Sequence, residues 1–280
     1  MDLDIGASLL VSLQELTEAT MRSNNNSYIC HIAHPSALDK LKADERTKTT
    51  GRYHYMHYNM EPVSAFKIMS RKFMHEQDSA NPAYAMYHEM TDKFFAQMRE
   101  VYEKYAETSN NPIETLEDLK SLFPVHPATA NMATYYAREV GSSSRSVFEF
   151  LGSNPAIRAF LDNEAYFAEG QMITSDYLWD FVLDEFNNKT VKYGVVTERF
   201  NSYKLHVAKK GESYLAVFKS ILLLNAFNNL AANETVTPSE ENIRNMYVGT
   251  PIDEEINDIL NWINTEGVVQ RSPQGIYEIR

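Results

Sequence analysis

Apolar residues recur every three or four positions along most of this chain, a pattern that predicts amphipathic helices. The segment 213–230 is apolar on almost every face, so it should form the buried centre of a helical subdomain. Further helices are predicted from shorter patterns. They cover residues 6–23, 36–42, 62–74, 85–105, 128–140, 155–160 and 175–186.

Two short stretches near the start of the chain predict strands instead. Residues 28–33 form an apolar run bounded by polar turns, and residues 52–60 are aromatic and roughly alternating. Strands and helices therefore alternate over the first 75 residues, which indicates part of an α/β unit.

The C-terminal stretch predicts a small domain of its own. The sequence Thr237-Pro238-Ser239-Glu240 has the pattern of a capping box with proline at the first helical position, so a helix should begin there. Helix, turn, helix and hairpin in this order predict a winged helix. The predicted elements are a helix to about residue 247, a turn over 249–251, a helix over 253–266 and a hairpin of 268–271 with 276–279.

The charge of the second of these helices bears on what the winged helix binds. It carries five acidic residues and no lysine or arginine, so phosphate repulsion makes insertion into a DNA groove unfavourable. Packing against protein is the favoured interpretation. The alternative is DNA contact by the wing through Arg271 and Arg280, as in a transcriptional regulator that binds duplex DNA in a salt-sensitive way.

A second informative stretch is LFPVHPATANMATYYAREVGSSSRSVFEFL, residues 122–151. Prolines on both sides of His126 predict extended backbone there, followed by a helix that ends at Gly141. The serines 142–144 can cap a second helix with Arg145 in its first turn and Val147, Phe148 and Leu151 on its buried face. An arginine fork at a helix start suits a phosphate or a carboxylate, and pairing with a neighbouring surface acid is the plainer alternative.

This stretch resembles the helical lid of large bacterial P-loop ATPases, which are AAA+-like proteins found in phage-defence systems such as the BREX type. The shared features are an aromatic-Pro-apolar-His-Pro segment, a helix, Arg-Ser and Phe-x-Phe-Leu. The resemblance implies that Arg145 is a sensor-2 residue that reaches the nucleotide from the lid. It extends to LQELTEATMRS and YICHIAHPSALDKL, and implies that His34 ends the sensor-1 strand and that Arg52, after Gly51, acts on a neighbouring subunit's nucleotide.

The chain departs from that family in two respects. It contains no G-x-x-x-x-G-K-[ST] loop to cradle phosphates, and no apolar strand that ends in Asp-Glu to direct Mg²⁺. We therefore expect this chain alone to be inactive, with ATP and Mg²⁺ bound only by a longer parent protein. The favoured explanation is that Met1 lies just downstream of the Walker B acid, and a stand-alone relative that has lost catalysis is the other.

Composition adds few constraints. A net charge of −12 and a pI near 5.2 argue against a dominant nucleic-acid-binding surface but allow a local basic patch. No apolar run approaches membrane-spanning length, so we expect a cytoplasmic protein without membrane contact. Cys30 should be a reduced buried thiol. The helix around His88 lacks the second histidine of a zinc protease, so no metal site is expected.

These patterns together predict a mainly α protein with small α/β and winged-helix parts. We expect the end of an AAA+-like core at 1–75, a helical lid with an insertion at 76–232 and a winged helix at 233–280. The parent would couple ATP hydrolysis to remodelling of DNA or a protein complex, through self-association or with other subunits. The alternative function is a non-catalytic helical and winged-helix adaptor that binds protein or, less favourably, DNA.

Overall fold

The computed structural model describes residues 15–22, 69, 80, 82–139, 145–163, 169–228 and 234–279. The chain divides into two compact units, Met1–Asn59 and Met60–Arg280. In the first unit, residues 15–22 are helical, in agreement with the helix predicted over 6–23. The predicted strands 28–33 and 52–60 lie outside the described residues, so the AAA+-like core stays a prediction.

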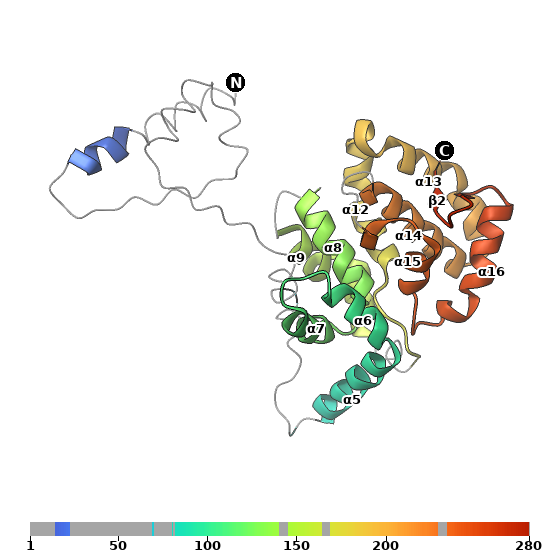
Figure 1. Ribbon diagram of the computed structural model, residues 1–280, viewed down its shortest axis with the longest axis horizontal. Helices are drawn as coiled ribbons and strands as arrows, with labels where there is room; N and C mark the ends of the chain where they lie inside the picture. The colour runs from blue at the N-terminus through green and yellow to red at the C-terminus, as the bar shows by residue number, and fades with distance from the viewer. Residues whose placement is uncertain are drawn as a thin grey trace. The chain divides into compact units, whose positions relative to one another are not determined.

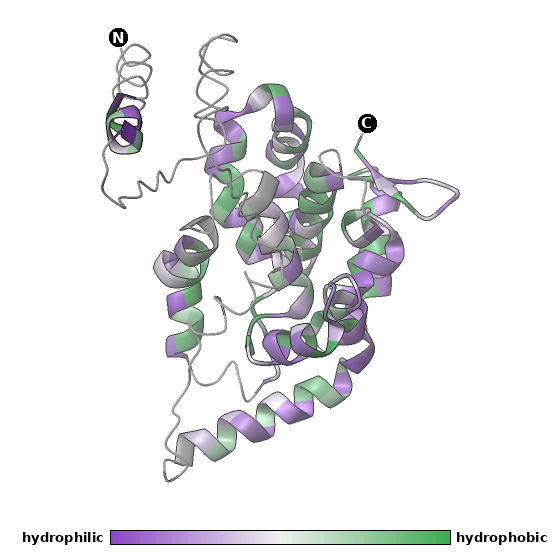
Figure 2. Cartoon of the chain, turned by 60° about the vertical axis from the view of Figure 1, so that its left-hand side comes forward, coloured by the Kyte–Doolittle hydropathy of each residue, from purple (hydrophilic) through white to green (hydrophobic). Residues whose placement is uncertain are grey.

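The described part of the second unit is mainly helical (Figure 1). Hydrophobic and hydrophilic residues alternate along its helices (Figure 2), and one cluster of buried hydrophobic residues runs through the described part of the unit. Within the residues that the structure describes, no helix has both the length and the apolarity needed to cross a bilayer.

Among the described residues, six helices lie in the first half of this unit. The helix predicted over 85–105 is divided at Met98, whose backbone leaves the helical region at φ −115° and ψ 21°. Met98 is buried against Gly249, so a tertiary contact and not the local sequence accounts for the break. Helix α7 was not predicted; it opens on a proline at a position where helices accept one. The six are α5 (Pro82–Gln97), α6 (Arg99–Ala106), α7 (Pro112–Lys120), α8 (Pro127–Glu139), α9 (Arg145–Ser153) and α10 (Pro155–Asp162).

The segment before α8 is extended, as the flanking prolines predict. Val125 pairs in parallel with Ile173, and two backbone hydrogen bonds flank this bridge. The His126 N–H donates to the Ile173 carbonyl at 3.1 Å, and the Ile173 N–H donates to the Pro124 carbonyl at 2.9 Å. The start of α8 is therefore fixed to the segment that leads into the next long helix.

Three long helices form the centre of the unit. The predictions over 175–186 and 213–230 are confirmed by α12 and α14, and α14 is buried along most of its length. The helix between them was not predicted. Its buried residues nevertheless recur at helical spacing and pack against both neighbours. The three are α12 (Ser175–Asn188), α13 (Thr190–Ala208) and α14 (Glu212–Asn228).

The C-terminal elements follow the predicted order of helix, turn, helix and hairpin. The strands pair antiparallel, with Gln270 opposite Glu278 and Arg271 opposite Tyr277. Both helices pack against α14, so the elements on either side of the predicted boundary at residues 232 and 233 are in direct contact. The elements are a 3₁₀ turn η2 (Glu234–Val236), α15 (Glu240–Asn245), α16 (Ile252–Thr265), β1 (Gln270–Arg271) and β2 (Tyr277–Glu278).

The start of α15 differs from the prediction. Its N-cap is Ser239, whose hydroxyl accepts the Asn242 N–H at 3.2 Å, so the helix does not begin at Pro238. The residues before it are extended because they pair with the hairpin. The Pro238 carbonyl accepts the Tyr277 N–H at 2.8 Å, and Ser239 forms an antiparallel bridge with Ile276. Pairing with the hairpin, which the local sequence does not reveal, keeps Pro238 and Ser239 extended. The helix therefore begins two residues later than predicted.

Candidate functional site

Only some of the predicted site residues lie in the described part of the chain. His34, Arg52 and Arg280 lie outside the described residues. Arg145 is the first residue of α9, as predicted, but its side chain lies outside the described part. Arg271 is described in full.

Helix α9 is anchored by its apolar face. Leu151 is buried, as the sequence predicts, and so is Phe150, whose ring centroid lies 5.5 Å from that of Phe181 on α12. Helix α9 also packs against α8 and α10. The helix start that carries Arg145 is thus held on the folded core by the residues that follow it.

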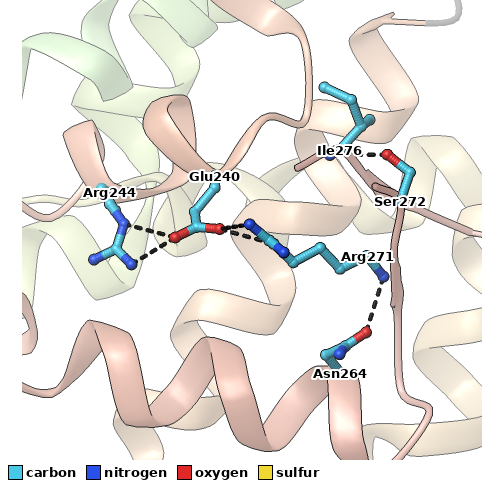
Figure 3. Close-up of polar contacts among 6 residues, drawn as sticks. All are labelled: Glu240, Arg244, Asn264, Arg271, Ser272 and Ile276. Atoms are coloured by element: carbon cyan, nitrogen blue, oxygen red, sulfur yellow. Dashed lines mark hydrogen bonds and ion pairs between the residues drawn. The ribbon is translucent and has the colours of Figure 1, made fainter. Parts of the chain in front are cut away.

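The described site lies at the base of the hairpin formed by β1 and β2, which the sequence predicts as the wing of a winged helix. Glu240, the first residue of α15, accepts from two arginines (Figure 3). Arg244 reaches one carboxylate oxygen with Nη2 at 2.7 Å and Nε at 3.2 Å. Arg271 reaches the other oxygen with both Nε and Nη2 at 2.8 Å. The bonds from Arg244, and then those from Arg271, lower the pKa of Glu240.

The backbone around Arg271 is also fixed. Its N–H donates to the Asn264 side-chain oxygen at 3.0 Å, which ties the wing to the end of α16 (Figure 3). The Ser272 hydroxyl accepts the Ile276 N–H at 3.2 Å across the hairpin turn. The Arg271 guanidinium is directed back to α15. A DNA phosphate would have to compete with the Glu240 carboxylate for this guanidinium. DNA contact through Arg271 stays a prediction.

The neighbouring helix α16 has the polarity expected from the sequence. The predicted inward residues Ile256, Ile259, Leu260 and Ile263 are all buried. Its first turn carries Asp253, Glu254 and Glu255. Negative charge at this end of a helix interacts favourably with the helix dipole. The Asp253 carboxylate accepts the Gly249 N–H at 3.2 Å. Part of this acidity therefore stabilises the helix start, and the exposed remainder disfavours a phosphate backbone.

His126 forms a buried contact that was not predicted from the sequence. Its ring is fully buried and joins α8 to the turn between α15 and α16. Nδ1 accepts the Ala128 N–H at 3.2 Å and so caps α8, which leaves the proton on Nε2 to be donated to the Val248 carbonyl at 3.2 Å. Burial lowers the pKa of His126 to about 4. The prolines on either side marked this histidine in the sequence, but gave it no role in packing.

A second set of buried polar side chains comes from α14, the turn after α15 and the start of α12. The Ser220 hydroxyl and the Tyr247 hydroxyl are 2.6 Å apart, and the Thr174 hydroxyl donates to Asp176 at 2.6 Å. Burial raises the pKa of both Asp176 and Tyr247. In the described ranges, side chains of His, Cys, Asp and Glu nowhere gather in groups of three that could hold a metal ion.

No protein-family model, curated protein or solved structure matches this chain. The similarity to AAA+-like ATPases therefore rests on sequence patterns alone, those of residues 122–151 and of the segments around His34 and Arg52.

Proposed function

We propose that this chain supplies the helical lid and a C-terminal winged helix of an AAA+-like ATPase that remodels a protein or DNA complex, as phage-defence ATPases do. The observation that carries the proposal is the helix pair α8 and α9. The aromatic-Pro-apolar-His-Pro segment leads directly into α8, and α9 starts at Arg145, the order that the resemblance to the lid requires.

In this proposal Arg145 binds the phosphates of the nucleotide from the lid. A guanidinium at a helix start offers a fixed set of donors to phosphate oxygens. His34 contacts the same nucleotide from the core, and Arg52 acts across a subunit boundary. The phosphate-cradling loop and the Mg²⁺-directing acid are absent from these 280 residues, so ATP and Mg²⁺ would be held mainly by another segment.

The winged-helix assignment is supported by the order of the C-terminal elements. Helix α14, the extended residues at Ser239, α15, α16 and the hairpin follow one another, and Ser239 pairs with Ile276 beside the hairpin. The acidic exposed face of α16 and the pairing of Arg271 with Glu240 favour protein over DNA as its target.

The lid and the winged helix are proposed to move together. The His126 ring bonds the start of α8 to Val248, and Met98 fills the space beside Gly249 in the same turn. Buried contacts of this kind repack between discrete arrangements and do not deform continuously. A shift of the lid on nucleotide binding would therefore also change the arrangement of the wing.

Replacing Arg145 by alanine in the native ATP-hydrolysing protein is expected to lower kcat by at least about tenfold, because a donor to the transferring phosphate is lost. Steady-state ATP turnover measures the effect. Arg158→Ala is the matched control, since Arg158 is an exposed arginine on α10. Unaltered turnover with Arg145→Ala would remove Arg145 from the nucleotide site.

The target preference is tested with DNA. We expect the full chain to leave a duplex of about 30 base pairs unshifted in a gel at about 50 mM salt, because α16 is acidic and Arg271 is occupied by Glu240. Glu240→Gln, which weakens the hold on Arg271, is the sensitised variant. Salt-dependent binding by the unmodified chain that Arg271→Ala abolishes would instead support the wing as a DNA contact.

A further inference from the structure

The outer face of α13 combines exposed aliphatic side chains with positive charge. Val191 is fully exposed, and the exposed fractions of Val195 and Leu205 are 60% and 73%. These three positions lie within about 80° of one another around the helix, so they form one stripe, which we call the α13 stripe. Glu198 and Ser202 lie on the same stripe between them.

Folding of this chain does not account for the stripe. The opposite face of α13 buries Tyr193, Val196, Phe200 and Val207 against α12 and α14. That face supplies the packing that the helix needs. Exposed aliphatic residues that share one face on the other side of the helix are typical of a surface that another helix covers.

The charge around the stripe is opposite to that of the whole chain. Residues 189–210 contain six lysines and arginines and one glutamate, a net charge of +5 in a chain of net charge −12. Lys192 and Lys210 lie over the rings of Tyr193 and Tyr214 at 5.5 and 5.6 Å. Within the described residues neither lysine forms an ion pair, so both charges are available to an outside partner.

We propose that the α13 stripe binds an acidic amphipathic helix of a partner protein. Apolar residues of that helix would cover Val191, Val195 and Leu205, and its flanking carboxylates would pair with the lysines beside them. The stripe with Lys209 spans about 27 Å, the length of a helix of about 18 residues. Nucleic acid fits less well, because phosphates would pair with the lysines but leave the aliphatic side chains in water. The inference is independent of Arg145 and the nucleotide.

A fluorescein-labelled helical peptide of about 21 residues, with leucine at its a and d positions and glutamate beside them, is a suitable probe. Fluorescence anisotropy with the full chain is expected to show saturable binding that weakens as salt rises. Val195→Ser and Lys192→Glu should each weaken binding by roughly tenfold. Ile113→Ser is the matched control, because Ile113 is an 80% exposed aliphatic residue on α7, and it should leave binding unchanged.

Circular dichroism confirms that each variant is folded, because the substituted positions are exposed. The proposal is overturned if the peptide does not bind, or if a version with serine in place of leucine binds equally well. It is also overturned if Lys192→Glu weakens binding, Val195→Ser does not, and duplex DNA competes as well as unlabelled peptide. That last result would identify a general polyanion surface.

Discussion

Replacing Gly249 by alanine is expected to lower the free energy of unfolding by about 3 kcal/mol. Gly249 has φ +77°, a conformation that costs an L-residue about 1 kcal/mol. A Cβ there would also lie 2.7 Å from Cγ and 2.8 Å from Sδ of Met98. Met98 is almost fully buried at the break between α5 and α6, so it has little room to move. Urea denaturation of the two proteins measures the difference.

Gly267 provides the matched control for this prediction. It also has a positive φ, +68°, but a Cβ there would meet nothing within 4 Å. Gly267→Ala should therefore cost only the backbone term, about 1 kcal/mol. Equal losses for the two substitutions would show that the Met98 contact does not constrain the turn.

Acidification is expected to destabilise the protein through His126 by about 3 kcal/mol between pH 6.5 and 4. Burial holds the pKa of His126 at about 4 in the fold, below the unfolded value of 6.5. The unfolded chain therefore takes up the proton first. The contribution to stability is complete above pH 6.5 and is lost as the pH falls toward 4. Protonation would also remove the acceptor at Nδ1 that caps α8.

The measurement compares urea unfolding of wild type and His126→Gln from pH 7 to pH 4.5. Wild type alone is not diagnostic, since Asp176 has a raised pKa and its protonation shifts stability in the opposite direction. The variant retains Asp176 and cannot take up a proton at position 126. The stability difference between the two proteins should shrink as the pH falls, and parallel profiles would contradict the assignment to His126.

Both predictions concern the turn between α15 and α16, residues 247–250. Three parts of the chain meet it: Met98 from the α5–α6 break, His126 from the start of α8, and Ser220 from α14, which bonds Tyr247. This turn is where the predicted lid and the predicted winged helix share their buried contacts. A variant that loosens it without unfolding the chain would also test the proposed coupling of lid and wing.

Much of the helical architecture was predictable because its signals are local. The apolar run of α14, the stripe of α16, the glycine at 267 and the prolines around His126 each act within a few residues. Helix α13 was missed because it begins with β-branched residues and contains Gly194, which lower helix propensity, although its buried positions have helical spacing. Packing against α12 and α14 offsets that low propensity.

At the candidate site too, the sequence indicated which residues matter, and the fold decided their partners. The sequence singled out Arg271 as a charged wing residue, but only the fold brings Glu240 to it from 31 positions away and directs its guanidinium toward α15. The sequence also marked His126 by its prolines, and only the fold buries the ring against Val248 and lowers its pKa.

The sequence by itself determined the mainly helical class, the order of the C-terminal elements and the acidic character of α16, because periodicity and charge are properties of neighbouring residues. Tertiary structure decided where α15 begins, where the helix over 85–105 breaks and which polar groups are joined. Those features depend on cross-strand pairing with Ile276, contact with Gly249 and burial of His126, which are set by residues far apart in the chain.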